Sequence, residues 1–261
     1  NCPTGMSAFG DLKGGHILLT RLTSCISDGR SGSNLGSLRR VLLYTLLNFF
    51  TVLFHTSASS PNNPTNVTFD MQEGALPAAL RNILENADAY GGVLVSLAAT
   101  LLSDVMNADP QTVKSVWSLG LADLFLSVVT SGRIAPASEL ILAVPSLLAS
   151  LALTEEGAAS VLSRNPFPSA LAIFHDPRYV MPHSRSMQND LPAIFGTNLD
   201  ELMRHVPKLR PAAIEACVTM TRSIADMGED PSLTGTHEGL TRLNQHCHHA
   251  SQMLEQVLLK P

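Results

Sequence analysis

The sequence has little charge and few aromatic side chains. Asp, Glu, Lys and Arg together make up 15% of its 261 residues, and Phe, Trp and Tyr make up 5%. The formal net charge is −5, and no segment carries the excess of Lys and Arg that nucleic-acid binding requires. We therefore expect no nucleic-acid partner. Hydrophobic residues, mostly aliphatic, reach 45%, which allows a large core and excludes disorder throughout.

Cysteine is also scarce. The four cysteines, Cys2, Cys25, Cys217 and Cys247, lie far apart and form no Cys-x-x-Cys pair. Cys25 and Cys217 stand among apolar residues and are predicted to be small buried side chains. This usage fits a reducing compartment better than secretion, so the expected location is the cytoplasm, the nucleus or both.

Long hydrophobic runs are missing. The most apolar stretch, 41–54, covers 14 residues and is interrupted by Thr45, Asn48 and Thr51. A membrane-spanning helix needs roughly 20 apolar residues, so no membrane association is expected. A helix that is apolar on all sides is usually one buried between neighbouring helices.

The motifs of common enzyme classes are absent. There is no P-loop, no Gly-x-Ser-x-Gly elbow and no dinucleotide-binding fingerprint. The glycine-rich run 29–36 follows a predicted helix rather than a strand, which favours a flexible linker. His237-Glu238 begins like a zinc-protease helix, but Thr241 stands where the second histidine would be. We assign no catalytic and no cofactor-binding residue.

One local cluster has residue types that bind metals. His246, Cys247, His248 and His249 are consecutive, and on a helix His246 and His249 would share a face. A structural zinc would need two more ligands, and a cluster this near the end of the chain has few to recruit. The favoured interpretation is a solvated helix face, so no metal ligand is assigned. A metal site, and with it a small helical metalloenzyme, is the alternative.

Apolar residues recur at helical spacing along the chain, and no stretch shows the sustained alternation of a strand. The predicted helices cover residues 11–27, 36–56, 75–89, 92–107, 110–118, 121–131, 136–152, 155–164, 168–175, 189–205, 208–227 and 236–259. The expected core stripe of the helix at 189–205 consists of Ile194, Phe195, Leu199 and Leu202. Asp200 and Arg204 stand four residues apart on the other side and are predicted to form an exposed ion pair.

A glycine-marked repeat accompanies the helices. Gly74, Gly120 and Gly157 each precede a short apolar segment, at intervals of 46 and 37 residues. These intervals bracket the roughly 40–47 residues of armadillo and HEAT units, and three helices per unit favour armadillo. We predict an all-α fold of armadillo-like repeats, an α-solenoid, with a compact helical bundle as the alternative. The expected parts are N-terminal helices and a linker (1–68), the repeat region (69–231) and a C-terminal helix (232–261).

Several short blocks in consistent order carry a resemblance to a known family. They are LLNF at 46–49, LPAAL at 76–80, DPRY at 176–179, LDELMRH at 199–205 and GEDP at 228–231. The ordered set, spanning about 38–231, resembles the N-terminal armadillo-like region of the giant Mule-type HECT ubiquitin ligases. One departure follows Tyr179, where the family often has a run of arginines and this chain has only His183 and Arg185.

The resemblance implies a segment of an E3 ubiquitin ligase whose thioester cysteine lies in a C-terminal HECT domain absent from this sequence. The segment itself is then not an enzyme, although the parent protein is. The implied partners are protein substrates and other segments of the same ligase, and the ubiquitin-conjugating enzyme binds only through the HECT domain. The sequence begins with Asn1 rather than Met, which favours an excised piece of a longer protein. A stand-alone armadillo adaptor without ligase activity is the alternative.

Overall fold

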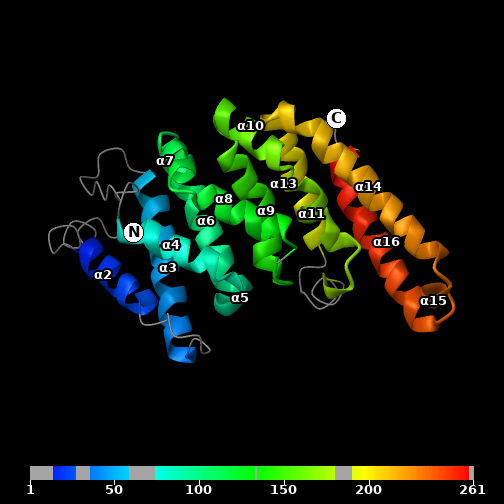
Figure 1. The fold of residues 1–261 in the computed structure, drawn as a ribbon, viewed down its shortest axis with the longest axis horizontal. Helices are drawn as coiled ribbons and strands as arrows, with labels where there is room; N and C mark the ends of the chain where they lie inside the picture. The colour runs from blue at the N-terminus through cyan, green and yellow to red at the C-terminus, as the bar shows by residue number, and fades with distance from the viewer. Residues whose placement is uncertain (1–13, 28–35, 59–73, 133, 180–189, 259–261) are drawn as a thin grey trace. The chain divides into compact units, whose positions relative to one another are not determined.

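The computed structural model describes residues 14–27, 36–58, 74–132, 134–179 and 190–258. These residues form α-helices and short 3-10 helices and no strand, so the all-α prediction is confirmed (Figure 1). The helical arrangement is compatible with a helical-repeat solenoid. Of the linker expected at 29–36, only Gly36 is described, and the loop that follows Tyr179 lies outside the described residues. The division of the chain at residues 68 and 231 stays a prediction.

The chain divides into two compact units, residues 1–125 and 126–261. The helices of the first unit are α2 (Gly14–Ser27), α3 (Ser37–Ala58), α4 (Ala75–Glu85), α5 (Ala87–Tyr90), α6 (Gly92–Ala108) and α7 (Thr112–Ser118). Helix α8 (Leu121–Thr130) contains the boundary. The second unit holds α9 (Ser138–Leu151), α10 (Glu155–Arg164), α11 (Phe167–Leu171), η2 (Ala172–Phe174), α13 (Leu191–His205), η3 (Pro207–Leu209), α14 (Arg210–Glu229), α15 (Pro231–Thr234) and α16 (His237–Leu258).

In the first unit, α2 packs against α4, and α3 packs against α6. Each helix buries an apolar stripe at spacings of three and four residues, as an amphipathic helix does. The buried stripe of α4 consists of Leu76, Ala79, Leu80, Ile83 and Leu84. The prediction of a single helix at 75–89 is wrong in one respect. The helix breaks at Asn86, which separates α4 from α5. Gly91 ends α5 with a φ of +80°, a conformation that glycine adopts without strain.

Over residues 38–52, helix α3 is buried on one side only. Leu43, Leu46, Leu47 and Phe50 are buried, whereas the expectation was a helix covered on all sides. Val41 and Tyr44 are exposed. Among the described residues no single helix has both the length and the apolar character of a membrane span, although the bent pair α7 and α8 meets the criteria when the two are taken together.

The glycine repeat is only partly reflected in the structure. Gly74 directly precedes α4, and Gly120, with a φ of +68°, separates α7 from α8. Gly157 is different, because it lies inside the first turn of α10. Its backbone N–H donates to the Thr154 hydroxyl at 3.1 Å, and Thr154 is therefore the N-cap of that helix.

In the second unit, α13 packs against α9 and against α16, and α11 packs against α14 (Figure 1). Because α13 is covered by helices on two sides, its buried surface is wider than a single apolar stripe. Phe195, Leu199 and Leu202 are buried and Arg204 is exposed, as predicted. Two assignments on this helix were wrong. Ile194 is exposed, and Asp200 is buried with its Oδ2 atom 3.0 Å from Nε of Arg204.

Helices α13 and α16 are in tight contact at Gly196. An added Cβ at this position would collide with the backbone oxygen of Met253 and lie 3.1 Å from Cβ of Gln256. Neither the backbone oxygen nor Cβ can rotate away. The separation of the two helices therefore requires a residue without a side chain at this point.

We predict that Gly196→Ala lowers the free energy of unfolding by about 1–3 kcal/mol through overpacking. Gly228→Ala is the matched control, because its added Cβ would meet only Cδ2 of Leu243 at 3.8 Å, an ordinary contact. The control is expected to be neutral or to gain up to about 1 kcal/mol from helix propensity. Chemical denaturation of both variants measures the difference. Equal effects of the two substitutions would contradict a close contact at Gly196.

Candidate functional site

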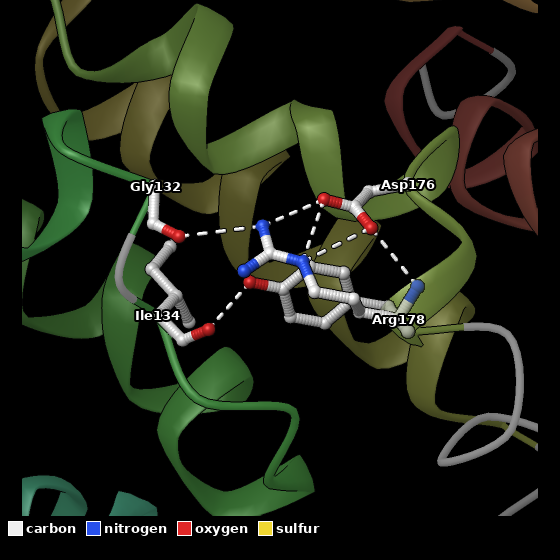
Figure 2. A network of polar contacts seen from close by, with 5 residues as sticks. Gly132, Ile134, Asp176 and Arg178 are labelled. Atoms are coloured by element: carbon white, nitrogen blue, oxygen red, sulfur yellow. Dashed lines mark hydrogen bonds and ion pairs between the residues drawn. The ribbon is translucent and has the colours of Figure 1, made fainter. Parts of the chain in front are cut away.

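A polar network in the second unit joins the residues after η2 to the segment before α9 (Figure 2). Asp176 accepts hydrogen bonds from the Arg178 backbone N–H at 2.9 Å, from Nε at 2.9 Å and from Nη2 at 2.6 Å. The same guanidinium donates to the backbone oxygen of Gly132 at 3.4 Å. The hydroxyl of Tyr179 donates to the backbone oxygen of Ile134. We call Asp176, Arg178 and Tyr179 the turn clamp.

The local sequence explains how the turn clamp forms. An Asp side chain just before a helix readily accepts a hydrogen bond from the backbone N–H two residues later, and Asp176 does so at the first turn of the helical residues 177–179. The turn brings the Arg178 guanidinium back onto the carboxylate, where its fork makes charge-assisted hydrogen bonds. The carbon at the centre of this guanidinium also lies 5.4 Å from the centroid of the Tyr179 ring. The clamp thus combines an ion pair, a backbone turn and a buried tyrosine.

Two pKa values reflect this geometry. The hydrogen bond from the Arg178 side chain lowers the pKa of Asp176, and burial raises the pKa of Tyr179. Asp176 is therefore held as a carboxylate and Tyr179 as a neutral phenol. A neutral phenol whose hydrogen is already donated to Ile134 cannot act as a general base. This arrangement favours a structural role, which the sequence did not reveal, although Asp176 followed by Pro177 is a signal for a break between helices.

We predict that Tyr179→Phe lowers the free energy of unfolding by about 1 kcal/mol, because the buried Ile134 oxygen loses its donor. Tyr44→Phe is the control, since Tyr44 is exposed on α3. Thermal or chemical unfolding of the two variants gives the comparison. A Tyr179→Phe variant as stable as Tyr44→Phe would show that the hydrogen bond adds nothing.

The histidine cluster is not a solvated helix face, which corrects the favoured sequence interpretation. His246 is 1% exposed and His249 is also buried, while Cys247 and His248 are exposed. The reason is tertiary: α16 packs against α13, α14 and η2, and the buried stripe of α16 includes both histidines. Nδ1 of His246 lies 2.8 Å from the backbone oxygen of Phe174, so it carries the hydrogen and donates it. Nε2 of His246 is buried and makes no hydrogen bond.

The metal alternative receives no support from this geometry. Within the described ranges, no three His, Cys, Asp or Glu side chains gather closely enough to hold a metal ion. Cys25 and Cys217 are buried, as predicted, and Cys2 lies outside the described residues. Burial raises the pKa of Cys217 to about 11, so its thiol stays protonated near neutral pH.

Burial lowers the pKa of His246, because a charged imidazole there would bury a second N–H without an acceptor. His175 lowers this pKa further, whereas the hydrogen bond to Phe174 and the charge of Asp176 raise it. Burial also lowers the pKa values of His175 and His249. The unfolded chain therefore binds protons at these histidines more readily than the folded chain does. The stability that the neutral histidines contribute is fully present above the unfolded histidine pKa of about 6.5, and it is lost as pH falls below that value.

We predict that His246→Asn reduces the loss of unfolding free energy between pH 7 and pH 5. Asn offers an N–H donor toward Phe174 but takes up no proton in this range. His237→Asn, at an exposed position on the same helix, is the control for the loss of one histidine. Denaturation curves at a series of pH values measure the slopes. A His246→Asn slope equal to that of wild type would contradict the assignment.

Comparison with known proteins agrees with the blocks identified in the sequence. The model of the family described as Domain of Unknown Function (DUF913) matches residues 24–256. The chain is 31% identical over 196 residues to the E3 ubiquitin-protein ligase UPL2 of Arabidopsis thaliana, covering 75% of the chain and 5% of that protein. It is 28% identical over 197 residues to the mouse E3 ubiquitin-protein ligase HUWE1, covering 74% of the chain and 4% of the relative.

A fungal relative matches a smaller part of the chain. The chain is 25% identical over 147 residues to the E3 ubiquitin-protein ligase TOM1 of Saccharomyces cerevisiae, covering 56% of the chain and 4% of the ligase. The chain thus matches about one twentieth of the length of these curated relatives. The resemblance to very large ubiquitin ligases is confirmed. Because the family model covers nearly the whole sequence, this chain belongs to the DUF913 family.

Proposed function

We propose that the chain is a non-catalytic, armadillo-like scaffold segment that recruits substrates within a HECT-type E3 ubiquitin-protein ligase. One observation carries the proposal: three quarters of the chain align with relatives named E3 ubiquitin-protein ligases, and the alignment occupies only 5% of such a relative. Ubiquitin transfer would then belong to a C-terminal HECT domain elsewhere in the parent protein. The partners would be protein substrates and other segments of the ligase, in the cytoplasm, the nucleus or both.

The physical properties of the two units support a scaffold. Packed helix pairs place apolar stripes inside and leave long outer faces for contacts with proteins, as helical-repeat proteins do. The described polar clusters serve the fold: the turn clamp joins two segments, and His246 joins α16 to η2. A thioester requires an accessible thiolate. Cys25 and Cys217 are buried, and the high pKa of Cys217 further opposes thiolate formation.

The test compares three proteins: the full parent ligase, the parent without residues 24–256, and the isolated chain. Each is incubated with activating enzyme, conjugating enzyme and ubiquitin, and reducible thioester adducts are separated by non-reducing electrophoresis. Parent and deletion variant are expected to form the thioester equally, and the isolated chain to form none. Ubiquitination of substrates that bind the parent is expected to be lost in the deletion variant.

A parent variant with the HECT cysteine replaced by Ser is the control, and it should form no thioester while still binding substrates. A reducible ubiquitin adduct on the isolated chain that disappears with Cys247→Ser would show catalysis in this segment. Full substrate ubiquitination by the deletion variant would exclude the recruiting role.

A further inference from the structure

Lysine is scarce in this chain, although arginine is not. The sequence has four lysines, Lys13, Lys114, Lys208 and Lys260, against 13 arginines. Lysine is normally among the commonest residues of a soluble domain. Both side chains supply a positive charge, but arginine keeps its proton, and lysine is the residue to which ubiquitin is attached. The chain therefore carries its positive charge mostly on groups that cannot accept ubiquitin.

Lys208 has a partner on another helix. It lies in η3, and its Nζ atom donates a hydrogen bond to Oε1 of Glu155 on α10 at 2.8 Å. This hydrogen bond lowers the pKa of Glu155, so the carboxylate stays charged beside the ammonium group. The side chain of Lys208 is 63% exposed, so solvent reaches it. Its nitrogen must nevertheless leave Glu155 before it can approach another reactant.

Lys114 is presented differently. Helix α7 buries Val113 and Val116, and Lys114 lies on the exposed side of the same helix. Within the ranges that the structure describes, its ammonium group has neither an ion pair nor a hydrogen bond. Lys13 and Lys260 lie outside those ranges. Of the two described lysines, Lys114 is therefore the one whose nitrogen can meet an incoming reactant without first breaking a bond.

The reactant follows from the proposed function. A scaffold that recruits substrates lies in the same polypeptide as the ubiquitin thioester, where a tethered amine has a high effective concentration. The neutral Nζ atom of a lysine attacks the thioester carbonyl carbon, so that a C–N bond forms and the C–S bond breaks. The nitrogen gives up one proton, and the leaving thiolate takes one up. The products are an isopeptide and a thiol, with no oxidant or reductant.

We propose that Lys114 is a site at which the parent ligase attaches ubiquitin to itself, and that Glu155 protects Lys208 from the same modification. This inference rests on the proposed function, because a ubiquitin ligase must supply the thioester. The scarcity of lysine leaves few amines on the scaffold that compete with those of the substrate. On the described surface, self-modification then falls on α7.

The experiment incubates the full-length parent with activating enzyme, conjugating enzyme and ubiquitin, and mass spectrometry quantifies the ubiquitin remnant at each lysine. The remnant at Lys114 is expected to exceed that at Lys208 by about twofold to fivefold, the range set by one exposed ion pair. Lys114→Arg keeps the charge and is expected to remove this adduct while the parent still modifies its substrates. Lys208→Arg is the matched control and is expected to leave the Lys114 adduct intact.

Glu155→Ala adds a second arm, because it releases Lys208 and is expected to raise the Lys208 adduct toward that at Lys114. Glu156→Ala, exposed in the same turn of α10, is its control and is expected to change neither adduct.

Two results would overturn the proposal: a Lys208 remnant as abundant as that at Lys114 in the unmodified sequence, or a Lys208 remnant that Glu155→Ala leaves unchanged. Ubiquitination of substrates with no remnant at Lys114 would overturn this inference and leave the proposed function standing. A parent that modifies neither its substrates nor itself would overturn both.

Discussion

The packing of the second unit depends on the missing side chain at Gly196. Helix α13 contacts α9 and α16, and it can approach α16 closely only because no Cβ meets the Met253 backbone. Leu199 and Leu202 on α13 and Met253 and Val257 on α16 are all buried. Dispersion and apolar burial depend steeply on distance, so a small increase in helix separation would weaken many contacts together.

The same close packing determines the roles of the polar side chains. His246 reaches the Phe174 backbone because α16 lies against η2, and Tyr179 reaches Ile134 because the turn after η2 lies beside the segment before α9. A buried polar group is costly unless it is hydrogen-bonded. In the described part of the chain, the side chains of His246 and Tyr179 therefore stabilise contacts between segments that are distant in sequence.

The two units share a principle: apolar stripes are covered wherever a neighbouring helix exists. On α3 the inner stripe, which includes Leu43 and Phe50, is buried, whereas the apolar outer surface at Val41 is exposed. That contrast is informative because α3 is apolar on both sides, whereas a surface helix normally has one polar side.

The sequence by itself determined the helices, the all-α class and the family, because helical periodicity and short motifs are local properties. The helices predicted at 92–107 and 155–164 match α6 and α10 closely, and the burial of Cys25 and Cys217 follows from their apolar neighbours. Only the tertiary structure decided which helices are covered by neighbours on more than one side. As a result, Asp200 and His246 are buried, whereas Ile194 is exposed. The periodicity of one helix describes its own faces, but the helices that cover those faces come from distant parts of the chain.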